Sequence, residues 1–312
     1  MSEAVLLMAY GSPDRLDQVE AYYTDIRRGS PPSPQLLEEL VGRYRAIGGG
    51  SPLSQIVEAQ RAALQAELAA RGQALRVYAG MRHIEPRIGR IVEGMAADGV
   101  ERFAAIALAP QKSASADGYG RAVEAALAGL GEKPPSVVVV DSWHDQRRFI
   151  EALAATTREA LDRFPSATRV QIMFTAHSLP ARVVAEGDPY PGQLAETAAL
   201  VAQQLGLTEY AFAFQSAGRT GEAWLGPDIL AEIRRLAGAG VAELVVRPVG
   251  FVADNLEVLY DIDIEAQAVA RDVGVRLERA RSMNDDPIFI AGLADVAAAA
   301  LAKTQREPAG AS

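Results

Sequence analysis

The stretch VVRPVGFVADNLEVLYDIDIE, residues 245–265, is the part of the sequence that best indicates the fold. Its first residues are β-branched and predict a buried strand, and the Pro-Val-Gly that follows predicts a turn. Asp254 is then in the right place to cap the start of a helix. On that helix Glu257, Asp261 and Glu265 are spaced at i, i+4 and i+8, so their carboxylates share one face.

This row of carboxylates needs an explanation, because like charges one turn apart repel and destabilise a helix. A charge run on a helix is usually a solvated face. The alternative is a bound cation. The row begins just beyond an apolar strand and its turn, and open α/β sheets bind ligands past the carboxyl ends of their strands. Both explanations remain open, and the position of the row favours a ligand site.

Apolar segments of strand length alternate with amphipathic segments of helical length along the chain. This alternation indicates βαβ units and parallel sheets. The predicted strands are 4–9, 75–80, 103–109, 137–141, 170–175, 210–215, 243–248 and 274–278. The predicted helices are 14–26, 35–47, 51–71 with Ser51 as its cap, 86–98, 118–130, 146–164, 192–205, 227–239, the acidic helix, and one from 286.

A weak internal repeat suggests two lobes. The first strand is followed by AYGSP at 9–13, and a strand in the second half by AHSLP at 176–180. We expect an α/β fold of two similar Rossmann-like lobes, each a parallel sheet flanked by helices, with a ligand cleft between them. The predicted lobes are residues 1–142, with a helical insertion at about 10–70, and residues 143–285, which carry His177 and the acidic helix. The C-terminal helix, 286–306, is expected to pack back on the first lobe.

The composition limits the possible functions. The content of 49% hydrophobic and 23% charged residues is typical of a soluble globular protein, and the net charge of -9 argues against nucleic-acid binding. No Cys is present, which excludes disulfides, thiolate zinc sites and cysteine-held iron–sulfur clusters. No basic leader and no membrane-length apolar run are found, so we expect a cytoplasmic protein without a transmembrane segment.

The chain has 3 His. His83 and His144 are expected to be hydrogen-bonded structural residues, as lone His usually are. His177 follows a buried strand in a turn-rich sequence, a position that suits acid–base chemistry near neutral pH. Ser178 beside it lacks the surrounding Gly-x-Ser-x-Gly of a hydrolase elbow, which argues against a serine hydrolase.

The arginines of the insertion suggest an acidic ligand. No dinucleotide or P-loop glycine motif is present, so the cleft is left for another kind of ligand. Arg27, Arg28, Arg43 and Arg45 suit carboxylates or phosphates, or are solvated surface residues. Together with aromatic residues they suit a large flat ligand with acidic groups; these residues are Tyr10, Tyr119 and Trp224. The acidic row suits a hard or borderline cation such as Fe²⁺.

Several motifs, in this order, resemble those of the ferrochelatases. They are TAHSLP (175–180), GDPYP (187–191), FQS (214–216), WLGP (224–227) and GFVADNLEVLYD (250–261). The N-terminal motifs MAYGSP (8–13), YYTDIRRG (22–29) and YRAIGGGSPL (44–53) are most similar to those of the compact soluble bacterial members, several of which act on coproporphyrin. The resemblance covers nearly the whole chain.

The resemblance implies an enzyme of haem biosynthesis, a lyase that inserts Fe²⁺ into a porphyrin held in the cleft. Coproporphyrin III is favoured over protoporphyrin IX by the extra arginines and the N-terminal motifs. By motif, His177 and Glu257 carry over as the catalytic, metal-binding pair, and Asp261 and Glu265 as further metal-site residues. The positions that match porphyrin contacts are Tyr10, Arg27, Arg43, Ser51 and Tyr119. We expect no prosthetic group, and the lack of an apolar membrane-facing extension in the sequence favours a monomer.

Two positions depart from the family pattern. Asn255 stands where a His is common, which is a minor departure. Lys112 stands where an aromatic residue or His is usual, which puts local porphyrin contacts in doubt. In the expected mechanism His177 accepts pyrrole protons, Glu257 binds the metal or accepts a second proton, and Asp261 and Glu265 guide cations in or protons out. The alternatives are another tetrapyrrole chelatase, for example one for cobalt, and a non-catalytic haem or porphyrin carrier.

Overall fold

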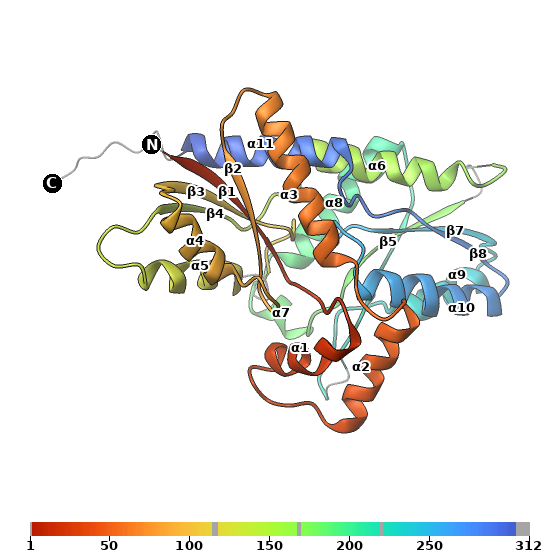
Figure 1. Cartoon of the computed structure of the whole chain (residues 1–312). Helices are drawn as coiled ribbons and strands as arrows, with labels where there is room; N and C mark the ends of the chain where they lie inside the picture. Colours follow the sequence, from red (N-terminus) through yellow and green to blue (C-terminus); the bar gives the residue numbers. More distant parts are fainter. Residues whose placement is uncertain (1, 114–117, 167–169, 219–220, 304–312) are drawn as a thin grey trace.

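A computed structural model describes residues 2–113, 118–166, 170–218 and 221–303, and contains two four-stranded sheets (Figure 1). All strand pairs are parallel, which confirms the predicted α/β class. The first sheet has the order β2-β1-β3-β4, with β1 Glu3–Ala9, β2 Arg76–Met81, β3 Arg102–Ala107 and β4 Ser136–Val140. The second has the order β6-β5-β7-β8, with β5 Gln171–His177, β6 Ala211–Gln215, β7 Glu243–Pro248 and β8 Arg276–Arg279.

Helices connect the strands close to the predicted positions. Those of the first half are η1 Leu16–Gln18, α1 Val19–Ile26, α2 Pro34–Ala46, α3 Leu53–Ala70, α4 Ile88–Ala97 and α5 Gly118–Ala128. Those of the second half are α6 Arg147–Leu161, α7 Arg182–Ala185, α8 Tyr190–Leu205, α9 Ile229–Gly238, η3 Glu257–Ala266, α10 Gln267–Asp272 and α11 Pro287–Lys303. The short α7 was not predicted, because four residues are too few to show a helical period. Residues 304–306 of the expected last helix lie outside the described residues.

Strand β1 shows why the strands read as continuous apolar runs. Val5 and Leu7 point into a core shared with α3, whereas Leu6 and Met8 point to the opposite face, into the core with α4 and α5. Successive side chains of a strand alternate between the two faces of the sheet. Both faces of a parallel sheet are covered by helices, so every position of the strand is apolar.

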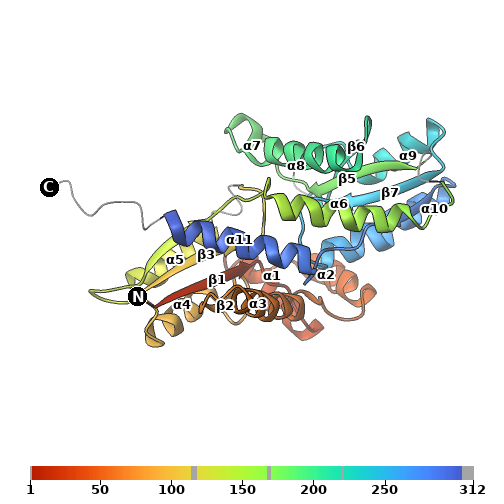
Figure 2. The same ribbon diagram turned by 90° about the horizontal axis from the view of Figure 1, so that it is seen from above.

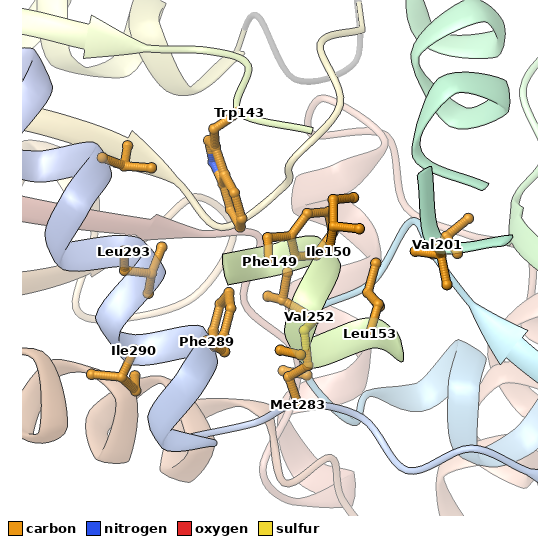
Figure 3. Close-up of a cluster of buried hydrophobic side chains, with 14 of the residues drawn as sticks. Trp143, Phe149, Ile150, Leu153, Val201, Val252, Met283, Phe289, Ile290 and Leu293 are labelled. Carbon is orange, nitrogen blue, oxygen red and sulfur yellow. The ribbon is translucent and has the colours of Figure 1, made fainter. Parts of the chain in front are cut away.

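The two sheets share one continuous hydrophobic core. In Figure 2, α6 and α11 run side by side between the sheets. Their side chains meet around Trp143, whose ring lies 5.1 Å from that of Phe149 and 6.0 Å from that of Phe289, as Figure 3 shows. Large buried aromatic rings contribute much of the stability of such a core. Movement of one entire lobe against the other would therefore disrupt these buried contacts.

The helical insertion also reaches the second lobe. Val19 of η1–α1 and Tyr44 of α2 are buried against Leu256, which immediately precedes η3. In Figure 1, α1 and α2 form a separate layer beyond the carboxyl end of β1. The insertion therefore packs on the start of the acidic helix.

The acidic helix differs from the prediction in two respects. It is a π-helix, in which Gln267 N donates to Ile262 O, five residues earlier. Asp254 is not its cap: Asn255 takes that role, with Oδ1 accepting from Val258 N at 3.0 Å. The carboxylate of Asp254 is instead bonded to the β8 region. π-Helical segments are rare and occur frequently at functional sites.

Two smaller differences concern residues expected at element ends. Helix α3 begins after Pro52, and Ser51 lies one residue before the cap, where its Oγ accepts from Leu53 N at 3.3 Å. Strand β5 continues to His177, two residues beyond the predicted end of the strand. None of the helices in the described ranges is both long and apolar enough to cross a membrane.

Candidate active site

A cleft of about 380 Å³ lies at the carboxyl ends of the strands and is lined from both lobes. The first lobe contributes Tyr10 after β1, Leu108 after β3 and Tyr119 of α5. The second lobe contributes His177 and Glu257. Its volume is in the range of small-molecule sites, and most of the wall is apolar. Four of the predicted site residues thus meet at one cleft: Tyr10, Tyr119, His177 and Glu257.

His177 is held in a defined orientation at the end of β5. Its Nδ1 bonds to the carbonyl oxygen of Ser178, and because a carbonyl only accepts, Nδ1 carries the proton. The backbone carbonyl of His177 accepts from the hydroxyl of Tyr190 at 3.0 Å. In the neutral ring Nε2 is therefore the free acceptor, as a base or a metal ligand requires.

Ser178 is excluded as a nucleophile by its surroundings. It is fully buried, and its Oγ donates to the carbonyl oxygen of Leu225 at 2.8 Å. The hydroxyl therefore fixes the neighbouring loop, in agreement with the sequence argument against a serine hydrolase.

The turn after β7 brings Glu257 to the same cleft as His177. Gly250 in this turn passes close to β5: a Cβ atom there would lie 3.1 Å from Cβ of Ala176 and 3.4 Å from the hydroxyl of Tyr190. Phe251, the next residue, packs with its ring 6.5 Å from the imidazole of His177. Glycine suits this position because Ala176 and Tyr190 approach it closely, and not because of an unusual dihedral angle.

Asp261 shows how the repulsion within the acidic row is relieved. Only 4% of the residue is exposed, which excludes a simple solvated face. Its Oδ1 lies 3.4 Å from Nη1 of Arg43, and its Oδ2 accepts from the hydroxyl of Ser216. Burial raises the pKa of Asp261 to about 7, and the neighbouring charge of Glu257 adds to this effect. The half-buried Glu265 lies at the far end of the row.

The guanidinium of Arg43 therefore faces Asp261 in this structure, and it also lies 5.0 Å from the ring centroid of Tyr260. Arg27 is exposed at the end of α1, directly after Ile26, which lines the cleft. Ser51 is buried and is not among the residues that line the cleft. Lys112 pairs with Asp141 at 2.6 Å.

Several polar residues near the cleft were not predicted to be site residues. His83 bonds to Asp25 at 2.6 Å, and its ring lies 4.4 Å from that of Tyr10. Arg87 makes two bonds to the same carboxylate. His144, away from the cleft, bonds to Ser142 and Glu196. Both His are hydrogen-bonded, as expected, but nothing in the local sequence indicated that His83 would support Tyr10.

A hydroxyl pair lies under the insertion. Ser12 and Tyr44 are buried and are joined by a bond of 2.7 Å, and Ser12 lines the cleft. Burial raises the pKa of Tyr44 and of Tyr119, so both phenols stay protonated and can donate hydrogen bonds at neutral pH. The first lobe thus presents neutral hydroxyl groups, and the second presents an imidazole and carboxylates.

A compact metal centre is not formed by the described residues, among which no three His, Asp or Glu side chains are grouped so that they could hold a metal ion. Any metal at His177 and Glu257 would have few protein ligands. Structural zinc sites are closed by four protein ligands, whereas catalytic zinc sites keep one position open for water or substrate.

The two-lobed α/β architecture with a cleft at the strand ends is that of the chelatases. A solved structure of SirB from Bacillus subtilis with Fe3+ superposes with a TM-score of 0.64 at 12% identity, covering 98% of both chains, and this likeness concerns the fold alone. The profile of the ferrochelatase family matches residues 2–301, and the chain belongs to this family. It is therefore an enzyme, a lyase of haem biosynthesis that acts on iron and a porphyrin.

Curated relatives are similar over almost their whole length. The chain is 46% identical to a ferrochelatase of Thermus thermophilus, with 95% of this chain and 98% of that protein covered. It is 43% identical to a coproporphyrin III ferrochelatase of Geobacillus thermodenitrificans, with 96% of both proteins covered.

Proposed function

We propose that this enzyme inserts Fe²⁺ into coproporphyrin III, with His177 and Glu257 as the catalytic pair. The observation that carries the proposal is the lining of a single cleft by Tyr10 and Tyr119 from one lobe and by His177 and Glu257 from the other. A flat macrocycle placed between the lobes would have phenol groups on one side and the base and carboxylate on the other. Relatives named coproporphyrin III ferrochelatase support the choice of substrate.

The exposed arginines of the insertion favour a porphyrin with several propionates. Arg27, Arg28 and Arg45 are exposed near α1 and α2, whereas Arg43 is occupied by Asp261. Guanidinium groups bind carboxylates through paired hydrogen bonds. Coproporphyrin has four propionates and protoporphyrin has two, so the tetra-acid can use more of these cations. In the proposal Ser51 supports the arginine-bearing insertion indirectly, because its Oγ bonds to Leu53 N at the start of α3.

Metallation requires two pyrrole N–H protons to leave as the cation enters. In the proposal His177 accepts one of these protons at Nε2, which its bond to Ser178 leaves free, and the other leaves through Glu257 or along Asp261 and Glu265. Glu257 binds the incoming cation or accepts a second proton, while Asp261 and Glu265 guide cations inward or carry protons out. Bending the macrocycle to expose its nitrogens costs on the order of 1–5 kcal/mol, which binding of the propionates and ring would offset. Positioned bases typically contribute about 10²–10⁴-fold.

An anaerobic assay with Fe²⁺ and either coproporphyrin III or protoporphyrin IX tests the substrate. We expect a higher kcat/KM with coproporphyrin III, and equal or reversed values would overturn that choice. Parallel assays with Co²⁺ and Zn²⁺ separate an iron enzyme from a cobalt chelatase. Tight binding of the haem product without turnover would instead indicate a carrier.

The assignment of the base is tested with His177→Ala. We expect loss of metallation, with porphyrin binding, followed by fluorescence quenching, still measurable. His144→Ala is the matched control, because His144 is hydrogen-bonded but does not line the cleft, and it should retain turnover. Normal turnover by His177→Ala would rule out His177 as the proton acceptor.

A further inference from the structure

Gln215 is the residue opposite His177 in the second sheet, and it contacts both halves of the proposed catalytic pair. In the pairing of β5 with β6, His177 and Gln215 are partners. The backbone carbonyl of Gln215 accepts from the N–H of Ser178 at 2.7 Å, which fixes the end of β5. Its side-chain Nε2 donates to the backbone carbonyl of Glu257 at 3.2 Å. Gln215 is therefore hydrogen-bonded both to the residue that follows His177 and to Glu257.

The side chain of Gln215 is deeply buried, with 1% of the residue exposed. The orientation of its amide is fixed, because the carbonyl of Glu257 accepts only and must face Nε2. Its Oε1 has no hydrogen-bond partner among the described residues. A buried acceptor without a partner is unfavourable, and an apolar side chain of the same size would avoid it. The presence of an amide at position 215 is therefore best explained by the hydrogen bond that Nε2 donates to the carbonyl of Glu257.

The residue after Gln215 contacts the same helix one turn further on. Ser216 has a positive φ of 61°, a strained conformation for a residue other than glycine, and its hydroxyl donates to Asp261. The end of β6 thus holds η3 at Glu257 and at Asp261. These contacts account for the motif FQS, which the proposed mechanism leaves without a role.

We propose that Gln215 is a positioning residue that holds Glu257 at a fixed place relative to His177 during metallation. The inference rests on the proposed function, in which Glu257 handles the cation and His177 the protons. Gln215 touches neither substrate in this arrangement. It acts through the backbone of the first residue of η3, so its loss lets Glu257 shift while the cleft and the porphyrin wall are kept.

The test is Gln215→Leu, with Gln215→Met measured alongside in case the branched side chain does not fit. We expect unfolding temperatures close to that of the wild type, because removal of the unpaired Oε1 offsets loss of the Nε2 bond to Glu257. The porphyrin dissociation constant should not change. The kcat/KM for Fe²⁺ should fall on the order of 10–100-fold, mainly through KM for the metal, since small misplacements of a reacting group have effects of this size.

Gln171→Leu is the matched control. Gln171 lies at the other end of β5, and its Nε2 also donates to a backbone carbonyl, that of Ile172, at 3.0 Å. Turnover and metal dependence should be unchanged in this variant. An equal loss in both variants would show that Gln215 acts only through the stability of the sheet, and would overturn the inference.

Zn²⁺ affinity, measured by calorimetry without porphyrin, shows whether Gln215 acts through Glu257. Gln215→Leu and Glu257→Gln should each weaken binding, and the double variant should bind no more weakly than Glu257→Gln alone. Additive losses would overturn the inference. Its failure is distinct from failure of the proposed function: if wild type metallates and His177→Ala does not, but Gln215→Leu is normal, only the role of Gln215 is lost.

Discussion

Arg279 and Asp263 form a bidentate ion pair, with Nε 2.6 Å from Oδ1 and Nη2 2.9 Å from Oδ2. The remaining nitrogen, Nη1, lies 3.1 Å from Oδ1 of Asp254 in the turn before η3. Asp254 also accepts from Ser282 and Asn284. One side chain of β8 thus joins the body of the π-helix to the turn that precedes it.

Replacing Arg279 with Met should destabilise the fold. The change leaves the carboxylates of Asp254 and Asp263 without their cation, and only 14% of the Arg279 side chain is exposed. Removing one partner of a buried pair costs about 3–5 kcal/mol, and the low end applies here because 33% of the Asp263 side chain is exposed. Urea unfolding measures the free-energy change.

Two further variants show whether the loss of stability in Arg279→Met comes from its paired hydrogen bonds to η3. Arg279→Lys should lose less, because it keeps the charge but not the forked geometry. Arg276→Met is the matched control at the start of the same strand, where 47% of the side chain is exposed. If Arg276→Met were as destabilising as Arg279→Met, the link to η3 would have no special importance.

Asp261 should make the stability depend on pH. Its pKa in the folded protein is about 7, above the value near 3.9 expected when unfolded. The folded state therefore binds more protons between these two values, and stability falls as pH rises from about 4 to about 7. Above pH 7 the cost of burying the ionised carboxylate is fully present and no longer changes.

Asp261→Asn removes this titration. Thermal unfolding of both proteins from pH 4.5 to 8.5, with a chelator present, should show the variant gaining stability relative to the wild type up to about pH 7. The difference should then stay constant. Arg43, whose side chain is 32% exposed, remains hydrated after the change. Parallel curves for the two proteins would show that Asp261 titrates normally.

Glu265→Gln should mainly weaken the response to metal concentration. Glu265 lies at the outer end of the acidic row, and its charge contributes to raising the pKa of Asp261. We expect a higher KM for Fe²⁺ with little change in kcat, and a smaller effect at high salt, because salt screens the charge of a partly exposed carboxylate. Glu243→Gln, at the opposite end of β7, makes the same charge change and is the control. Unchanged metal dependence would reduce Glu265 to a surface charge.

The fold was predictable because its information is local. Most strands lie within apolar runs and the longer helices show their own period, so the alternation could be read without knowledge of contacts. The π-helix could not be predicted in this way, because the pattern of Glu257, Asp261 and Glu265 fits an α-helix equally well. The helix is also held by contacts that are distant in sequence, such as those of Arg279 and Gln215, which no local pattern shows.

The same distinction applies to the site. Tyr10 and His177 could be predicted as site residues because each comes at the end of an apolar strand, where parallel sheets bind ligands. Asp254 was misread as a cap, since Asp before a helix usually has that role. Its three partners lie 25 to 30 residues later in the sequence. His83 likewise depends on Asp25, which is 58 residues away.

Gly250→Ala tests whether the close approach of the β7 turn to β5 is needed for activity. The new Cβ would lie 3.1 Å from that of Ala176, tighter than ordinary contact, so the turn must shift by a few tenths of an ångström. Overpacking of this kind costs about 1–3 kcal/mol. Because the turn leads to Glu257, kcat/KM should fall by more than the loss of stability explains, which activity assays well below the unfolding temperature would show.

The compensating variant makes this prediction specific. Gly250→Ala combined with Ala176→Gly removes the closest contact and should restore turnover, although the hydroxyl of Tyr190, 3.4 Å from the new Cβ, limits the recovery. Gly94→Ala in α4 is the control, because nothing lies within 4 Å of its Cβ position and alanine favours a helix. If Gly250→Ala were as active as Gly94→Ala, the spacing between the β7 turn and β5 would not limit the placement of Glu257 beside His177.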